Sequence, residues 1–284
     1  MRILHELTLL RRERRPVVLA IGFFDGVHSG HRRVIGRAIA RAKTLGGRAW
    51  VLTFDPHPLK LLHPACAPAL LTSTPHKLRL LSSLGVDGCV VMPFTRSLAR
   101  LPPREFVDLL KSCAPRLAEI LVGRNWRFGR HGSGTPATLS RLCRGTPIGV
   151  RIVPPVRREG GPVSSTRVRH EIGQGHLRTA EILLGRPFSI LGTVIHGRGI
   201  GRKIGFPTAN LDPHGEALPP FGVYAVQARL GPRLMDGVLS IGVRPTFRHR
   251  GKARPSYELH IPGVRRRLYG ADLEVIFGAK LRDE

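Results

Sequence analysis

Apolar and polar positions alternate in two different ways along the chain. From residue 17 to about residue 156, short apolar runs rich in β-branched residues alternate with segments whose apolar positions recur three and four residues apart. The runs are typical of buried strands and the segments of amphipathic helices. The expected strands are residues 17–24, 48–54, 86–94, 118–123 and 148–156. The expected helices are residues 31–46, 75–85, 103–113, 135–143, 164–175 and 176–185. This alternation predicts a Rossmann-like α/β domain, a parallel sheet with helices on both faces.

After residue 186 the pattern changes to strand-like runs separated by glycine and proline, with almost no helical periodicity. These runs are residues 188–197, 222–230, 235–245, 256–263 and 271–281. Such a series predicts a small antiparallel β-barrel or sandwich. We therefore expect two domains, residues 1–186 and residues 187–284, as the chain length also suggests.

The composition adds a large positive charge. Lysine and arginine number 46 against 19 acidic residues, which gives a formal net charge of +27. Such a charge favours polyanionic partners such as nucleic acid or phosphorylated small molecules. Arginine is spread along the whole chain, however, and aromatic residues make up only 6%, too few for a base-stacking surface. Small phosphorylated molecules are therefore the favoured partners.

Other bulk features point to a cytoplasmic protein. No apolar run approaches the length of a membrane helix, and the first 16 residues lack the features of a signal peptide. The four cysteines form no CxxC pair and are expected to be reduced core residues. The sequence gives no indication of the oligomeric state.

The stretch AIGFFDGVHSGH, residues 20–31, joins an expected strand to an expected helix, the place where α/β sheets bind ligands. Gly22 and Gly26 allow a sharp turn, and Gly30 allows a phosphate to approach the backbone. The free N–H groups of the helix start form an anion site. His28 and His31 are placed to donate to the same phosphate oxygens. This stretch is expected to hold a triphosphate without a Walker lysine.

Three simpler interpretations remain open for this stretch. Asp25 and Gly26 would suit a plain turn, and His28 would suit a surface position at a helix start. The two histidines would also suit a metal, although no third ligand follows at a suitable spacing and the glycines would then be unexplained.

The stretch resembles the G-x-F-D-G-V-H-x-G-H signature of the nucleotidyltransferase half of bacterial bifunctional riboflavin kinase/FAD synthetases. Further similar segments keep the family's order: FDPHP (54–58), LLTSTPHKLRLL (70–81), VGRNWRFG (122–129), VSSTRVRHEI (163–172) and HGRGIGRKIGFPTANL (196–211), then FGVYAV, IGVRPTF and YELHI. Phe23 and Arg124 depart from the family pattern without removing a presumed catalytic group. The resemblance implies that the first domain transfers AMP from ATP to FMN, which yields FAD and pyrophosphate.

The resemblance also implies roles for residues of the first domain. His28 and His31 would stabilise developing charge, and Asp25 would lie close to the ATP phosphates or their magnesium. Further phosphate-binding positions would be Gly22, Phe24, Gly26, Gly30, Ser164, Ser165 and Thr166, with Arg169 as a catalytic cation for the leaving pyrophosphate. Flavin-binding positions would be Asn125, Trp126 and Phe128. Two alternatives stay open: the serines would cap a helix whatever the function, and Trp126 and Phe128 would suit a hydrophobic core.

For the second domain the resemblance implies phosphorylation of riboflavin to FMN by ATP. The nucleotide phosphates would be bound by Gly199, Gly201, Arg202 and Lys203. Thr208 and Asn210 match positions that hold Mg²⁺, and Glu258 matches the base that takes the ribityl proton. Without the resemblance, Thr208 and Asn210 would read as turn residues after Pro207, and Glu258 as a solvent-facing strand residue.

Two departures weaken the kinase half. Pro262 and Gly263 stand where the family has a Leu-Asp pair, and the family's C-terminal helix, whose first turn Arg282 and Glu284 match, is expected to be missing here. Arg282 would bind flavin. The main prediction is a bifunctional enzyme with ATP, FMN, FAD and riboflavin as substrates and products. The alternatives are an adenylyltransferase with a kinase-deficient barrel and, less favoured, a basic nucleic-acid-binding protein.

Overall fold

The structure is a computed structural model of the whole chain, and it describes residues 1–196, 208–243, 255–264 and 268–284. The described residues form two compact units. The first unit contains residues 1–68 and 77–163, and the second contains residues 69–76 and 164–284. The sequence boundary at residue 186 stays a prediction, since contacts group the chain from Ser164 onward with the barrel.

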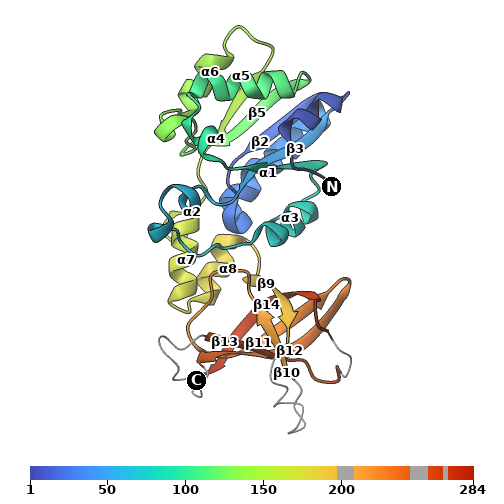
Figure 1. Cartoon of the computed structure of the whole chain (residues 1–284), viewed down its shortest axis with the longest axis vertical. Coiled ribbons are helices and arrows are strands. Elements are labelled where there is room, and N and C mark those ends of the chain that lie inside the picture. The colour runs from blue at the N-terminus through green and yellow to red at the C-terminus, as the bar shows by residue number, and fades with distance from the viewer. Residues whose placement is uncertain (197–207, 244–254, 265–267) are drawn as a thin grey trace. The chain divides into compact units, whose positions relative to one another are not determined.

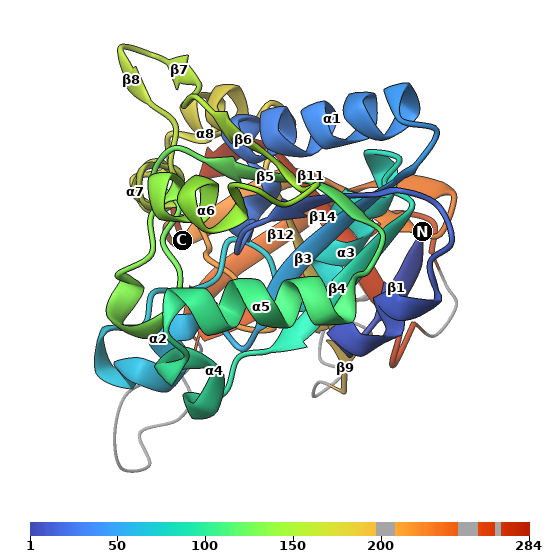
Figure 2. The same ribbon diagram turned by 90° about the horizontal axis from the view of Figure 1, so that it is seen from above.

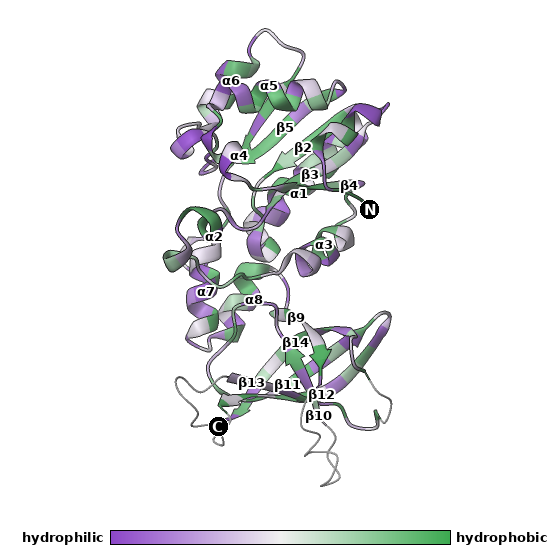
Figure 3. Cartoon of the chain, viewed as in Figure 1, coloured by the Kyte–Doolittle hydropathy of each residue, from purple (hydrophilic) through white to green (hydrophobic). Residues whose placement is uncertain are grey.

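The first unit contains a six-stranded parallel sheet (Figure 1). The strands run in the order β1 (Arg2–Leu4), β4 (Gly88–Pro93), β3 (Arg48–Asp55), β2 (Val17–Ile21), β5 (Leu117–Gly123) and β6 (Gly149–Val153). The five strands expected from the apolar runs are confirmed. The edge strand β1 is additional, and its mostly exposed residues carry no continuous apolar run. Every residue of β2 is buried, as is typical of a strand covered on both faces, and Figure 3 shows this strand in the green of hydrophobic residues.

Helices cover both faces of this sheet, so that it has two separate apolar cores (Figure 2). On one face pack α1 (Ser29–Thr44) and the first-unit part of α3 (Thr74–Ser83). On the other face pack α5 (Pro103–Cys113), α6 (Pro136–Cys143) and the 3₁₀ turn η1 (Leu7–Arg12). These arrangements confirm the predicted α/β fold. Shorter pieces not predicted are α2 (Pro58–Leu62), α4 (Arg96–Arg100), the 3₁₀ turns η2 (Asp25–Val27), η3 (Pro64–Cys66) and η4 (Arg130–Gly132), and the hairpin β7 (Arg157–Arg158) and β8 (Gly161–Pro162).

The second unit contains a closed antiparallel barrel, which confirms the predicted architecture. Its strands follow the order β10 (Thr208–Asp212), β13 (Pro255–His260), β12 (Arg233–Val243), β11 (Gly222–Leu230), β14 (Asp272–Arg282) and β9 (Ser189–Ile195). Helices α7 (Ser165–Gly173) and α8 (Leu177–Leu184) precede it. Gly185 ends α8 in the left-handed region, at a φ of 69°.

The structure corrects three expectations. Arg282 is the last residue of β14, so the first turn of a helix does not begin there. Thr208 and Asn210 lie in strand β10 and are not turn residues. Cys66 is exposed, whereas Cys89, Cys113 and Cys143 are buried as expected, and all four thiols are free. Among the described residues, no helix has both the length and the hydropathy that would be needed to cross a membrane.

Candidate functional site

The stretch between Ile21 and His28 forms a strained turn at the carboxyl end of β2. This strand pairs with β3 on one side and with β5 on the other, so the turn lies where the strand order of the sheet reverses. Phe24, Gly26 and Val27 all have positive φ angles, of 52°, 80° and 43°. A positive φ is costly for phenylalanine and most of all for the β-branched valine. Such strain persists only where the surroundings hold it, and it gathers at functional sites.

His28 and His31 lie together at the start of α1. Their imidazole rings stack with centroids 3.6 Å apart and planes 16° from parallel. His28 is the N-cap of α1, and its Nδ1 accepts the backbone N–H of His31 at 3.3 Å. Because Nδ1 is the acceptor, the neutral His28 ring carries its proton on Nε2. The helix start therefore combines backbone N–H groups with an imidazole donor, an arrangement that suits an anion.

His31 is held in its neutral form. Burial, the neighbouring His28 and the ammonium of Lys77 together keep the pKa of His31 well below its usual value. Its Nδ1 is buried and has no hydrogen-bond partner within the described part of the chain. A buried polar atom without a partner is uncommon in a folded protein and calls for an explanation. An incoming polar ligand would supply the partner.

Two glycines of the motif are required by close contacts, and the third by its backbone conformation. A Cβ added at Gly22 would lie 2.9 Å from the ring of Phe24, and one at Gly30 would lie 3.0 Å from Cε1 of His28. Gly26 has a positive φ. The structure thus accounts for three glycines that the sequence pattern assigned to phosphate binding.

Two of the simpler interpretations of the motif do not fit the geometry. Asp25 is only 2% exposed and His28 only 5% exposed, so neither is part of a plain surface turn. Among the described residues no group of three or more His, Cys, Asp or Glu side chains is placed to hold a metal ion. The phosphate-binding interpretation of the His28–His31 pair stays a prediction.

The predicted flavin residues follow strand β5. Asn125 is exposed, whereas Phe128 is buried and belongs to the core that includes Phe106. Trp126 is half-buried and stacks on Phe128 with centroids 4.6 Å apart. The contacts of Phe128 agree with the core alternative, while Asn125 and one face of Trp126 remain candidates for ligand contact.

In the second unit, the SST motif begins helix α7. Ser164 is the N-cap, and its hydroxyl accepts the backbone N–H of Arg167 at 3.2 Å, as the capping alternative predicted. Ser165 is half-buried and Thr166 is exposed. Arg169 Nε donates to the carbonyl of Ala69 at 2.7 Å, so this side chain holds the 69–76 segment. The assignment of Arg169 to pyrophosphate stays a prediction.

The predicted kinase residues meet on neighbouring barrel strands. Asn210 on β10 pairs in register with Glu258 on β13, which places their side chains on the same face. Thr208 Oγ1 lies 3.4 Å from Glu258 Oε2. All three side chains are half-buried, on the face opposite the buried Leu211 and Leu259. Their hydroxyl, amide and carboxylate oxygens are the donor set that Mg²⁺ prefers.

Four of the predicted kinase positions lie outside the described residues: Gly199, Gly201, Arg202 and Lys203. A fifth predicted position, Arg282, is described. Arg282 is exposed at the end of β14, and its Nη1 is 3.5 Å from the carbonyl of Asp283.

Sequence reasoning missed two buried side chains beneath the turn. Lys77 is 2% exposed, and its Nζ lies 3.3 Å from Thr53 Oγ1 and 4.3 Å from the ring centroid of Phe23. Thr53 is fully buried and donates to the carbonyl of Phe23 at 2.9 Å. One signal was available: Lys77 is four residues before the buried Leu81, so it falls on the apolar face of its helix.

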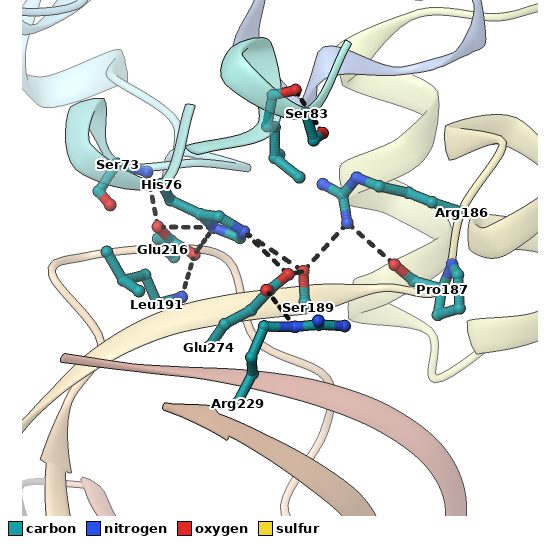
Figure 4. A network of polar contacts seen from close by, with 11 residues as sticks. Ser73, His76, Ser83, Arg186, Pro187, Ser189, Leu191, Glu216, Arg229 and Glu274 are labelled. Carbon is teal, nitrogen blue, oxygen red and sulfur yellow. Dashed lines mark hydrogen bonds and ion pairs between the residues drawn. The ribbon is translucent and has the colours of Figure 1, made fainter. Parts of the chain in front are cut away.

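Sequence reasoning also missed a buried polar network within the second unit (Figure 4). Glu216 accepts the backbone N–H groups of Ser73 and Leu191, at 2.7 and 3.0 Å, and contacts His76 Nδ1 at 3.0 Å. Ser189 lies 3.3 Å from His76 Nε2 and donates to Glu274 at 2.9 Å. The residues from segment 69–76 are thereby fixed to the barrel.

This network shifts the pKa values of its members. Burial opposes the charged form of His76, but hydrogen bonds to Glu216 and Glu274 outweigh it and raise the pKa of His76. The hydrogen bond from His76, against the effect of burial and with help from Ser189 and Arg229, lowers the pKa of Glu274 to about 2. The two carboxylates therefore favour the protonated form of His76.

A parallel α/β unit with an anion-suited helix start at its switch point, joined in one chain to a closed antiparallel barrel, is typical of a nucleotide-binding transferase. The sequence model described as FAD synthetase matches residues 10–167, and the one described as riboflavin kinase matches residues 184–284. The chain is similar to curated proteins named bifunctional riboflavin kinase/FMN adenylyltransferase. The one from Bacillus subtilis (strain 168) is 34% identical over 99% of this chain and 89% of the relative. The one from Escherichia coli (strain K12) is 37% identical over 94% of this chain and 85% of the relative.

A solved structure is similar over both halves. A Streptococcus pneumoniae protein described as a macrolide-efflux protein superposes with a TM-score of 0.82 at 28% identity, over 99% of this chain and 91% of that chain. From the curated relatives and the family matches, the chain belongs to the family of bifunctional riboflavin kinase/FMN adenylyltransferases. It contains both enzymatic domains of that family, which favours the bifunctional prediction over the single-activity alternative.

Proposed function

We propose that this chain makes FAD from riboflavin in two steps. The barrel transfers the γ-phosphoryl group of ATP to riboflavin and gives FMN and ADP. The α/β unit transfers AMP from a second ATP to FMN and gives FAD and pyrophosphate. The observation that carries the proposal is the His28–His31 pair at the start of α1, at the switch point of the sheet.

In adenylyl transfer, an oxygen of the FMN phosphate attacks the α-phosphorus of ATP. A new P–O bond forms there, the bond to the β-phosphate oxygen breaks, and pyrophosphate leaves with the electron pair. The protein contributes positioning and charge stabilisation more than covalent chemistry. The Nε2–H of His28 and the N–H groups of the α1 start would donate to the phosphate oxygens, and His31 would assist as a neutral imidazole. Charge that develops on the α-phosphate is thereby stabilised.

Other first-unit residues would place the two substrates. The resemblance assigns Gly22, Gly26 and Gly30 to the triphosphate, and Asn125 with Trp126 would contact FMN. The family resemblance assigns Ser165, Thr166 and Arg169 of helix α7, next to the Ser164 cap, to phosphate oxygens. These assignments rest on the family resemblance together with the chemistry of the side chains.

In the kinase reaction, the terminal ribityl hydroxyl attacks the γ-phosphorus of ATP while Glu258 takes its proton. The O–H bond breaks and a new P–O bond forms at the γ-phosphorus. The bond from the γ-phosphorus to the bridging oxygen breaks, and ADP leaves with its electron pair. Thr208 and Asn210 would hold Mg²⁺ through their side-chain oxygens, near Glu258. When bound, the ion neutralises charge on the nucleotide phosphates.

Because the four thiols are free, we place the enzyme in the reducing cytoplasm.

Two assays on the purified chain test the proposal. The first supplies riboflavin, ATP and Mg²⁺, and the second supplies FMN, ATP and Mg²⁺; the flavins are separated by chromatography. FMN and FAD in the first assay and FAD in the second support it. FAD from FMN with no FMN from riboflavin would leave only the adenylyltransferase. Tight, steeply salt-dependent binding of oligonucleotides without flavin turnover would instead indicate a nucleic-acid-binding protein.

A further inference from the structure

Lys77 is a lysine where lysine is rarely found. Its side chain is almost completely buried beneath the turn that precedes α1. Lysine is rarely buried to this extent unless it is paired, because the ammonium loses its hydration. Burial lowers the pKa of Lys77, while Asp25, Cys89 and Asp55 act in the opposite direction. The side chain therefore retains interactions that favour its ammonium form.

The hydrogen bonds that begin at Lys77 have only one possible direction. An ammonium has donors and no acceptor, so Thr53 Oγ1 must accept from Lys77 Nζ. The hydroxyl proton of Thr53 is then directed to the carbonyl of Phe23, 2.9 Å away. The ammonium also lies over the Phe23 ring, 4.3 Å from its centroid, within the range of a cation–π interaction. Lys77 thus contacts the Phe23 ring directly and reaches the Phe23 carbonyl through Thr53.

Phe23 begins the strained part of the turn. Phe24 and Val27, which follow it, have the positive φ angles, and the turn ends at His28. A backbone in this conformation needs outside contacts to keep it there. Moreover, the Lys77 charge is one of the causes that keep the His31 imidazole neutral. Lys77 therefore acts on Phe23 at the start of the motif and on His31 at its end.

We propose that Lys77 is a positioning residue for adenylyl transfer, which acts through Thr53 on the Phe23–Val27 turn and so fixes the two imidazoles. The proposal gives Lys77 no direct phosphate contact, because its contacts are to Thr53 and the Phe23 ring and its side chain is 2% exposed. The inference rests on the proposed adenylyltransferase function.

The experiment compares matched variants of the full chain. Lys77→Met keeps most of the side-chain volume and removes the charge, and Thr53→Val removes the hydroxyl, whereas Thr53→Ser retains it. The exposed Arg79→Met, on the same helix, is the control for loss of one positive charge. For each protein, kcat and KM are measured for FAD formation from FMN, and FMN formation from riboflavin reports on the second unit.

We expect Lys77→Met and Thr53→Val to lower kcat for FAD formation by about tenfold to a hundredfold, the size typical of small displacements of catalytic groups. KM for ATP should change less, and FMN formation should stay near wild type. Thr53→Ser should recover most of the rate, and Arg79→Met should match the wild type. Thermal stability of Lys77→Met should be equal or higher, since methionine costs no desolvation.

Three outcomes would overturn the inference. One is a normal kcat in Lys77→Met, and another is equal loss in Thr53→Ser and Thr53→Val. The third is a parallel loss of stability and of activity, which would make Lys77 merely structural. If the wild-type chain makes no FAD from FMN, the proposed function itself fails, and that result is distinguishable from these.

Discussion

A methyl group on Gly30 would lie 3.0 Å from Cε1 of His28 and 3.2 Å from its Nδ1. The third glycine of the motif thus packs directly against the first imidazole. The ring has little freedom to move, because its Nδ1 accepts the N–H of His31 and its face stacks on the His31 ring.

Gly30→Ala should therefore displace the His28 ring and lower the rate of FAD formation by about tenfold or more. Gly36 supplies a matched control, because it lies in the same helix α1 and an added Cβ would meet nothing within 4 Å. Gly36→Ala should keep full activity and raise the free energy of unfolding by about 0.4–1 kcal/mol. Equal activity of the two variants would show that the contact with His28 has no catalytic consequence.

Removal of either imidazole should affect only one of the two reactions. His28→Ala and His31→Ala should each lower kcat for FAD formation by about 10²–10³, the cost of losing one donor to developing charge. FMN formation from riboflavin should continue at the wild-type rate, since Glu258 and its neighbours belong to the barrel. Chromatography of the flavins after incubation with riboflavin and ATP should show accumulated FMN. FAD at wild-type levels would contradict the role of the pair.

Variants of the barrel residues Thr208 and Glu258 should lose FMN formation and keep FAD formation. Glu258→Gln removes the base that accepts the ribityl proton, and Thr208→Val removes a hydroxyl that lies 3.4 Å from it. Loss of a general base costs about 10²–10⁴ in rate, so FMN formation should fall by that factor. FAD formation from supplied FMN should be unchanged, and the circular-dichroism spectrum and melting temperature of the full chain show whether the barrel of each variant is folded. If Glu258→Gln phosphorylates riboflavin normally, the base lies elsewhere.

The His76–Glu216 pair should control the stability of the second unit. His76→Ala leaves Glu216 buried without its cationic partner, a change that typically costs about 3–5 kcal/mol. The double variant His76→Ala/Glu216→Gln should recover part of the loss. Hydrogen exchange of the Leu191 amide, which donates to Glu216, measures the effect within the unit. Unchanged exchange in His76→Ala would mean that the pair does not hold segment 69–76.

The same pair predicts how stability depends on pH. The pKa of His76 is raised by folding, so its contribution is complete below the unfolded value of about 6.5 and is lost as the pH rises through the folded value. The pKa of Glu274 is lowered to about 2, so its contribution is present above pH 4.5 and is lost as the pH falls through about 2. Chemical denaturation at several pH values should show a free energy of unfolding that falls as the pH rises through the raised pKa of His76. His76→Gln should remove this decrease in the free energy of unfolding at high pH.

The folds of the two units could be predicted because their buried apolar residues follow regular patterns along the chain. The continuous apolar runs of residues 17–24 and 118–123 mark strands covered on both faces, and α5 agrees with the expected residues 103–113. Strand β2 nevertheless ends at Ile21, because Phe24 adopts a positive φ that the apolar pattern does not reveal. Strand β10 was missed, since its TANLD sequence lacks an apolar run and owes its pairing to β9 and β13.

The site could be predicted only where its residues follow one another along the chain. His28, His31 and the glycines form one local motif, whereas Thr53 and Lys77 reach the same turn from separate elements. Likewise, His76 and Glu216 are 140 residues apart in sequence. Contacts of this kind depend on the packing of elements, and periodicity carries no information about them.

The assignment of residues 69–76 to the second unit limits how family members can be recombined. This piece of the barrel unit is encoded in the middle of the α/β unit, and it brings Ser73 and His76 to Glu216. In a hybrid that takes only residues 164–284 from a relative, His76 would come from this chain and the carboxylate at position 216 from the relative. Barrel exchange between homologues should therefore succeed when the short internal segment is transplanted with the C-terminal half.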